Sequence, residues 1–288
     1  RKIGVILPRE LIRKREILDL AIEVEKIGYD YVVACDHVVL PEQNLQKDAI
    51  KYTLDEKYMD PLTLLAAVAA VTNNIKLFTG VVVLPERPTA LVARQAADVD
   101  ILSEGRLNLG VGIGWLKEEF DALGLGDVFS YRGKRIEKQI LLLRQLWTQN
   151  SVTFSGSHED LKSVGINPRP IQQPIPVWIG GTNTKVIDRT VRIADGWIPR
   201  GKAIEFNDQL LPQLISSLNH NHRDPNSLPI MGKVNIRWQT EQNNWQKEGD
   251  DWLKSDLVSH LSVGSIGGSD SKINEHLKIL QKAREYFK

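Results

Sequence analysis

Short apolar runs alternate with longer amphipathic stretches along the whole 288-residue chain. The runs lack a charged outer face, which is typical of parallel strands covered on both sides. The stretches between them repeat apolar residues at helical spacing, as in 130–149 with Ile136, Ile140, Leu143 and Trp147. The predicted strands are 3–7, 31–35, 76–83, 107–113, 176–180, 195–199, 230–237 and 257–264. The predicted helices are 14–27, 61–72, 89–104, 130–149, 183–194, 203–220, 244–255 and 272–287.

Strict alternation of eight strands with eight helices predicts a (β/α)8 barrel. A doubly wound sheet is the main alternative, but it usually has a dinucleotide-binding glycine turn after its first strand, and the first strand here ends in ILPREL. We therefore expect one α/β domain over 1–288, a TIM barrel with insertions in its βα loops. Long connections at 38–60, 116–129 and 150–175 are predicted to form binding elements, and the last contains a predicted hairpin.

Composition narrows the class of partner. The 37 basic and 36 acidic residues are spread along the chain, which argues against a nucleic-acid partner or an anionic membrane surface. The longest apolar run, 62–71, is too short for the roughly 20 residues of a membrane span. Cys35 is the only cysteine, which excludes an intramolecular disulfide and fits a reducing compartment. We expect a cytoplasmic protein that acts on a small molecule.

The carboxyl ends of the barrel strands are where a site is expected. Asp36 and His37 follow the second strand, and histidine is the side chain suited to proton transfer near neutral pH. The alternative is an aspartate that closes a turn beside a structural histidine. These strand ends show no convergent pair of acids, no metal-ligand spacing of histidines and no G-x-S-x-G elbow. We expect no metal site.

Glycines punctuate the fourth predicted strand at Gly110, Gly112 and Gly114. They remove side chains where another backbone or a flat ligand comes close. The letters GVGIG do not make the full dinucleotide fingerprint, and they end a strand in the middle of the chain instead of opening a βαβ unit. The glycines are therefore interpreted as one side of a pocket for a planar ring, with Gly110 placed deepest and serving barrel packing.

The fifth strand ends in Gly180, Gly181 and Thr182, which lead into the predicted helix 183–194. Free amides at a helix N-terminus favour an anion, and the threonine adds a hydroxyl, so this turn suits a phosphate. The alternative is an ordinary strand-to-helix turn that Thr182 or Asn183 caps.

Four segments of the chain form a recognisable set: LFTGVVVLPERPTALVARQAADVDILSEGRLNLGVGIGWLKEEFDALG (77–124), DYVVACDHVVLP (30–41), NPRPIQQPIPVWIGGTN (167–183) and ADGWIPRG (194–201). Together they resemble the bacterial luciferase-like superfamily, which contains flavin-dependent monooxygenases and oxidoreductases that use the deazaflavin coenzyme F420. The resemblance covers most of 3–201 and is looser over the C-terminal third. It implies a barrel that binds F420 or FMN at its carboxyl face, commonly as a homodimer.

The resemblance also implies roles for particular residues. A bulge with a non-proline cis peptide behind the central ring would lie at Gly80-Val81 or Val81-Val82. The residues implied to flank ring and phosphate are Gly112, Gly114, Trp115, Gly180, Gly181 and Thr182. The pair Asp36-His37 matches several F420-using members, in which the histidine lies near the reactive ring atom, and FMN-using members can carry the same pair. Asp36 would bind the pyrimidine side of the ring or fix His37.

One position departs from part of the family. Some sugar-phosphate dehydrogenases of the group have a catalytic acid where this chain has Trp115, so their substrate and mechanism are not carried over. The expected function is hydride transfer between F420, or reduced flavin, and a small organic substrate. The alternatives are an FMN-dependent monooxygenase that activates oxygen and a flavin-binding protein without turnover.

Overall fold

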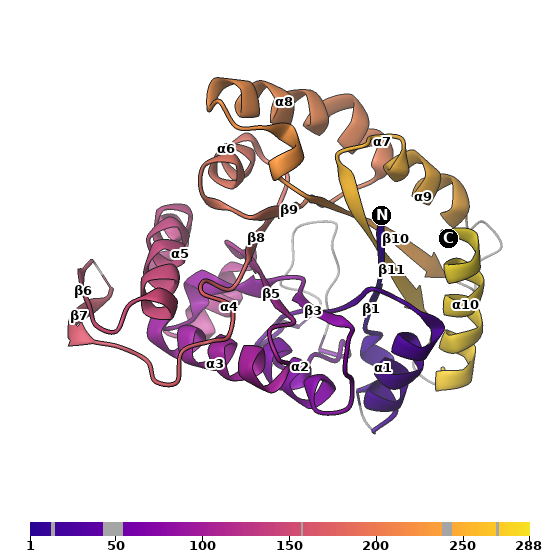
Figure 1. Ribbon diagram of the computed structural model, residues 1–288, viewed down its shortest axis with the longest axis horizontal. Coiled ribbons are helices and arrows are strands. Elements are labelled where there is room, and N and C mark those ends of the chain that lie inside the picture. The colour runs from indigo at the N-terminus through magenta and orange to yellow at the C-terminus, as the bar shows by residue number, and fades with distance from the viewer. Residues whose placement is uncertain (13–14, 43–53, 157, 238–243, 269–270) are drawn as a thin grey trace.

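The computed structural model describes residues 1–12, 15–42, 54–156, 158–237, 244–268 and 271–288. Parallel strands form a closed ring, in which β1 lies between β2 and β11 and the pairing of β3 with β5 completes the circle (Figure 1). β3 and β4 share one position in the ring, so the predicted (β/α)8 barrel is confirmed. The barrel strands are β1 (Lys2–Ile6), β2 (Tyr31–Ala34), β3 (Lys76–Thr79), β4 (Val82–Val83), β5 (Leu107–Gly112), β8 (Val177–Gly180), β9 (Gly196–Ile198), β10 (Ile230–Arg237) and β11 (Val258–Ile266).

Helices surround this ring and bury their apolar faces against the outer side of the strands (Figure 1). No helix among the described residues is both long and apolar enough to cross a bilayer. The helices are α1 (Glu16–Ile27), α2 (Pro61–Ala69), α3 (Thr89–Leu102), α4 (Lys117–Ala122), α5 (Arg132–Thr148), α6 (Thr184–Ile193), α7 (Ala203–Glu205), α8 (Leu211–His220), α9 (Trp245–Leu253) and α10 (Ile273–Tyr286).

Two predicted elements are interrupted. The strand predicted at 76–83 breaks between β3 and β4, and the helix predicted at 203–220 consists of α7, a π-helical turn at Phe206–Leu210, and α8. Pro212 explains the second break, because its missing amide cannot bond to the carbonyl four residues earlier. The short helix α4 inside the insertion 116–129 was not predicted.

The insertion at 150–175 contains the predicted hairpin, formed by β6 (Val152–Ser155) and β7 (Asp160–Val164). The hairpin lies outside α5 in Figure 1. Its Glu159 accepts a hydrogen bond from the Thr89 hydroxyl at 3.0 Å and pairs with Arg135 at 3.4 Å, which fastens the hairpin to α3 and α5. The hydroxyl of Thr89 therefore bonds to the hairpin, while Pro88 takes the N-cap position of α3.

The barrel interior contains its own apolar cluster. Tyr31, Val33, Phe78, Trp178 and Met231 pack together, with Ile6 and Ile198 against them. This interior cluster lies between the carboxyl ends of the strands, where a site is expected, and their amino ends.

Candidate active site

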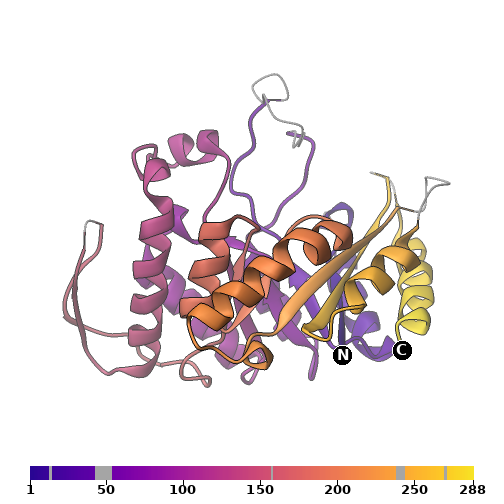
Figure 2. The same ribbon diagram turned by 90° about the horizontal axis from the view of Figure 1, so that it is seen from above.

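The candidate site lies at the carboxyl ends of the strands. The described residues of the connection from β2 to α2 rise from this side of the barrel, which is the upper side in Figure 2. His37 follows β2, and its Nδ1 lies 3.0 Å from Oε2 of Glu119 on α4. The backbone amides of Val38 and Val39 donate to Oε1 of the same carboxylate. Both carboxylate oxygens of Glu119 thus bind to His37 or to the two residues that follow it.

The Glu119 side chain is only 1% exposed, and that of His37 is 9% exposed. A buried carboxylate with three donors is fixed in place, and it fixes the ring that bonds to it. The contact with Glu119 fixes the direction in which Nδ1 of His37 points. This is the arrangement in which a base is oriented by a third group.

Aromatic rings enclose His37 on two sides. The ring of Tyr58 meets it edge to face at a centroid distance of 4.9 Å, and that of Trp115 at 6.2 Å. Tyr58 is held in turn by Arg9, whose guanidinium lies over the Tyr58 ring, donates to the Tyr58 hydroxyl and pairs with Glu56 at 2.6 Å. The histidine therefore lies in a partly apolar environment that limits its contact with water.

Asp36 points away from bulk water and into a buried network. Its Oδ2 accepts from the amide of Val83 at 2.9 Å, and its Oδ1 accepts from Arg87 at 2.8 Å. Arg87 also donates to Asp60, the N-cap of α2, at 2.8 Å. Burial raises the pKa of Asp36, and the Arg87 guanidinium opposes that rise. Both oxygens of Asp36 thus bond to protein groups. These bonds connect the end of β2 to β4 and, through Arg87, to the start of α2.

Glu86 is the least expected group near the site. The residue is 5% exposed, and neither carboxyl oxygen has a hydrogen-bond partner among the residues that the structure describes. Burial, together with the negative charges of Glu119 and Asp36, raises the pKa of Glu86 to about 9. The side chain is therefore a neutral carboxylic acid at pH 7, because its ionisation would add a further negative charge to this group of acids.

The bulge expected between β3 and β4 is present, and the Gly80-Val81 peptide is cis, which confirms the first of the two expected positions. The register with β5 shows the bulge: Phe78 pairs with Asn108, whereas Val82 pairs with Val111, so β3 and β4 contain one residue more than β5. Val81, the extra residue, is half-buried and lies at the carboxyl end of the strand.

The Val81 side chain explains two of the glycines. A Cβ added to Gly112 would lie 2.7 Å from Val81 Cγ2, and one added to Gly180 would lie 2.9 Å from Val81 Cγ1. Gly110 serves barrel packing, because its Cβ would lie 2.0 Å from the carbonyl oxygen of Thr79. Gly114 has a φ of +76°, and its carbonyl accepts from Arg132 at 2.9 Å. The glycines thus make room for protein groups, and the two that lie near Val81 are on β5, next to the bulge, and on β8, one strand further round the barrel.

The turn after β8 has features of both roles considered for its sequence, a phosphate-binding turn and a capped strand-to-helix turn. Asn183 caps α6 by accepting from the Val186 amide, and the amide of Gly181 bonds to the Ile198 carbonyl. Thr182 is half-buried, and the first amides of α6, those of Thr184 and Lys185, have no acceptor within the helix. The turn is therefore capped at one amide and still presents donors at the helix N-terminus.

Sequence reasoning missed several residues of this region. Glu119 lies in a short helix that was not predicted, 82 residues from its partner His37. The inner face of β10 carries Lys233 and Asn235, both exposed, while the alternate residues Val234 and Ile236 are buried. This polar–apolar alternation within KVNIR was the available signal. Among the described residues, no three His, Cys, Asp or Glu side chains lie together as a metal site.

A parallel barrel with a carboxylate-held histidine at the carboxyl ends of its strands defines a (β/α)8-barrel enzyme. The model of the luciferase-like monooxygenase family matches residues 2–260, and the chain belongs to that family.

The chain is similar to proteins that are named for different reactions. The chain is 32% identical over 215 residues to the F420-dependent glucose-6-phosphate dehydrogenase of Amycolatopsis mediterranei, covering 73% of this chain and 61% of that protein. It is 30% identical over 279 residues to the pyrimidine monooxygenase RutA of Variovorax paradoxus, covering 92% of this chain and 70% of that one. A solved structure of an F420-dependent secondary alcohol dehydrogenase, in complex with an F420-acetone adduct, has the same fold with a TM-score of 0.80. Its sequence is 16% identical to this one, and the match covers 100% of this chain and 99% of that chain.

Proposed function

We propose that this protein is an oxidoreductase that binds coenzyme F420 and transfers hydride between it and a small organic substrate. The observation that carries the proposal is the histidine His37, fixed by the buried Glu119 at the same barrel face as the Val81 bulge. The similarity to F420-dependent relatives supports the choice of cofactor.

The residues at this face fit a flat ring with an anionic tail. Val81 forms a half-buried surface, and Gly112 and Gly180 leave room for its two methyl groups. Thr182 and the amides that open α6 would hold the phosphate, with the role of Gly181 limited by its bond to Ile198. When bound, the cofactor supplies the hydride chemistry. The resemblance places Gly80, Val82, Gly114 and Trp115 in the same binding surface, and these roles are part of the proposal.

The chain's own residues would transfer the proton and exclude water from the reacting atoms. His37 would take or give a proton at Nε2, while Glu119 holds Nδ1 and stabilises the charged ring. Asp36 acts through Arg87 as a positioning residue beneath the histidine. Tyr58 and Trp115 would exclude water from the reacting atoms.

An FMN-dependent monooxygenase is the second candidate. The similarity to a pyrimidine monooxygenase over 92% of this chain favours it. The same residues would then surround a reduced flavin, so the cofactor decides between the two candidates.

A cofactor titration tests the proposal. We expect purified protein to quench or shift the fluorescence of F420 at tens of micromolar or below, with FMN binding at least tenfold more weakly. A preference for FMN would favour the monooxygenase. Binding of neither cofactor would contradict both candidates, and binding without turnover of any electron acceptor or donor would favour a flavin-binding protein.

Substitution of Gly180 tests the binding surface. Gly180→Val is expected to weaken cofactor binding at least tenfold, about 1.4 kcal/mol, because its side chain would displace Val81. The dissociation constant is measured by the same fluorescence titration. Gly156→Val, in the hairpin connection, is the control and should bind as the wild type does. An unchanged affinity in Gly180→Val would place the cofactor elsewhere.

A further inference from the structure

We propose that Lys233 of β10 binds an anionic group of the substrate, a carboxylate or a phosphate. This inference rests on the proposed function, because it names the class of substrate for the same site. Three polar residues alternate along β10 toward its carboxyl end: Lys233, Asn235 and Arg237, all exposed. These three residues are called the β10 strip below. Their ammonium, carboxamide and guanidinium groups all offer hydrogen-bond donors to an anion.

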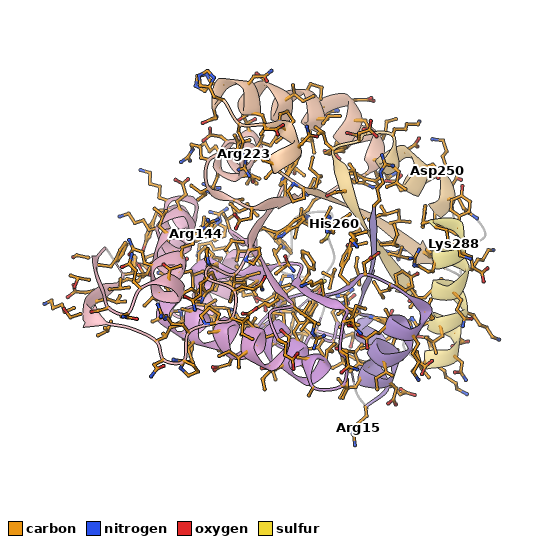
Figure 3. The ribbon with its side chains drawn as sticks, viewed as in Figure 1. Arg15, Arg144, Arg223, Asp250, His260 and Lys288 are labelled. Atoms are coloured by element: carbon orange, nitrogen blue, oxygen red, sulfur yellow. The ribbon has the colours of Figure 1, made fainter. Side chains whose placement is uncertain are left out.

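The β10 strip faces the inside of the barrel. Met231, two residues before Lys233, belongs to the interior cluster. It pairs in register with His260 of β11, which lies within the ring of strands in Figure 3. The residues between face the helices instead, since a Cβ on Gly232 would lie 2.7 Å from the Trp252 ring of α9. Because side chains alternate between the two faces of a strand, Lys233 points inward as Met231 does.

The inside of the barrel is open at the level of this strip. Gly264 of β11 pairs in register with Asn235, and a Cβ on it would lie 2.6 Å from Asn235 Oδ1 and 3.6 Å from Ile6 Cδ1. Branched side chains usually fill such interior layers. Lys233 points inward and is nevertheless exposed, and the interior cluster lies on its amino-terminal side. Solvent and small molecules therefore reach the ammonium from the carboxyl ends of the strands.

Lys233 has no counter-ion in the part of the chain that the structure describes. None of the ion pairs or hydrogen bonds among those residues includes it. The neighbouring inner face of β11 carries His260, Ser262 and Gly264, none of which is an acid. Glu10, in the turn after β1, accepts from the Gly267 amide at 3.3 Å. A cation on the inner wall of a barrel attracts an anion more strongly than one in bulk water does, and its hydrogen bonds to that anion are charge-assisted.

The place of β10 in the ring assigns this cation to the substrate. Going round the ring in either direction, β10 is the strand farthest from the position that β3 and β4 share, where the Val81 bulge lies. A cofactor ring that lies against Val81 turns its open face toward the β10 strip, and the substrate lies between them. His37 follows β2, which is next to β3 in the ring. The substrate would thus meet Lys233 with one end and the cofactor with the other.

Benzoate and benzamide, which have the same shape and differ in charge, provide the test. Each is titrated into the protein with and without F420, and its dissociation constant is measured by ligand-observed NMR. We expect benzoate to bind at least about tenfold more tightly than benzamide. Lys233→Gln should abolish this preference without changing benzamide binding, and Lys233→Arg, which keeps the charge, should retain most of it. Lys278→Gln, an exposed residue of α10, is the control and should bind both probes as the wild type does.

The outcomes separate this inference from the proposed function. Equal binding of benzoate and benzamide, or a preference that survives in Lys233→Gln, would overturn the inference. So would a tenfold loss of F420 affinity in Lys233→Gln, because the ammonium would then belong to the cofactor. Failure of F420 to bind, while benzoate still binds through Lys233, would contradict the proposed function and leave the anion site in place. Phenyl phosphate distinguishes the two anions: tighter binding than benzoate indicates a phosphorylated substrate, and weaker binding indicates a carboxylate.

Discussion

Glu119→Gln is expected to lower the rate of hydride transfer about 100-fold, within the range that general acid–base catalysis contributes. Glutamine keeps the shape of the side chain but has one acceptor oxygen instead of two. If that oxygen continues to accept from the Val38 and Val39 amides, the NH₂ group faces Nδ1 of His37. The ring must then carry its proton on Nε2, which is the wrong tautomer for a base at that atom.

The measurement is single-turnover oxidation of the reduced cofactor, followed by stopped-flow absorbance across a range of pH. The cofactor dissociation constant of Glu119→Gln should stay within about twofold of the wild-type value. Glu118→Gln, on the exposed side of the same helix, is the matched control and should react as the wild type does. A wild-type rate in Glu119→Gln would remove His37 from the proposed proton transfer.

Glu86→Gln is expected to raise the free energy of unfolding at pH 7 by up to about 3.5 kcal/mol. The native carboxyl keeps its proton to about pH 9, whereas the unfolded one releases it near 4.5. The native state therefore binds more protons between these values, and wild-type stability falls as pH rises through this window. Between pH 4.5 and pH 7 the free energy of unfolding of the wild type falls by about 1.4 kcal/mol for each of roughly 2.5 pH units. Glutamine does not titrate, so the variant escapes this loss.

Urea unfolding at pH 5, 7 and 8 provides the measurement. The free energy of unfolding of Glu86→Gln, relative to that of the wild type, should rise by up to about 1.4 kcal/mol per pH unit across this range. Glu285→Gln, an exposed residue near the C-terminal end of α10, should leave unfolding within about 0.5 kcal/mol of the wild type. Infrared difference spectra at pH 7 should show a protonated carboxyl that Glu86→Gln lacks. A variant that is less stable than the wild type at every pH would show that Glu86 is ionised and paired.

The barrel could be predicted from the sequence because each element carries its own signal. Apolar runs without charge identified strands such as β1 and β5, and helical spacing identified α5, all within a few residues of their observed bounds. The breaks could not be predicted in the same way. The interruption between β3 and β4 follows from the packing of Val81 against Gly112 and Gly180, two positions far from it in sequence.

The site was predictable where strand ends determine position and unpredictable where folding brings distant side chains together. His37 and Asp36 follow from the rule that barrel sites lie at the carboxyl ends of strands. The sequence offers two adjacent glutamates at 118 and 119, and only the orientation of α4 shows that Glu119 faces His37. The glycines were interpreted as space for a ring, and the structure shows the Val81 side chain in part of that space. The roles of these residues toward a cofactor remain predictions.

The double ion pair of Arg87 has a consequence for how this enzyme can change. Asp36 and Asp60 stand at the two ends of the connection between β2 and α2, and one guanidinium holds both. Arg87 itself belongs to the segment after β4, outside that connection. The two ends of this connection are therefore held in place by a single side chain that belongs to neither of them. A substitution at Arg87 would release both ends at once, and with them the described residues on either side that surround His37.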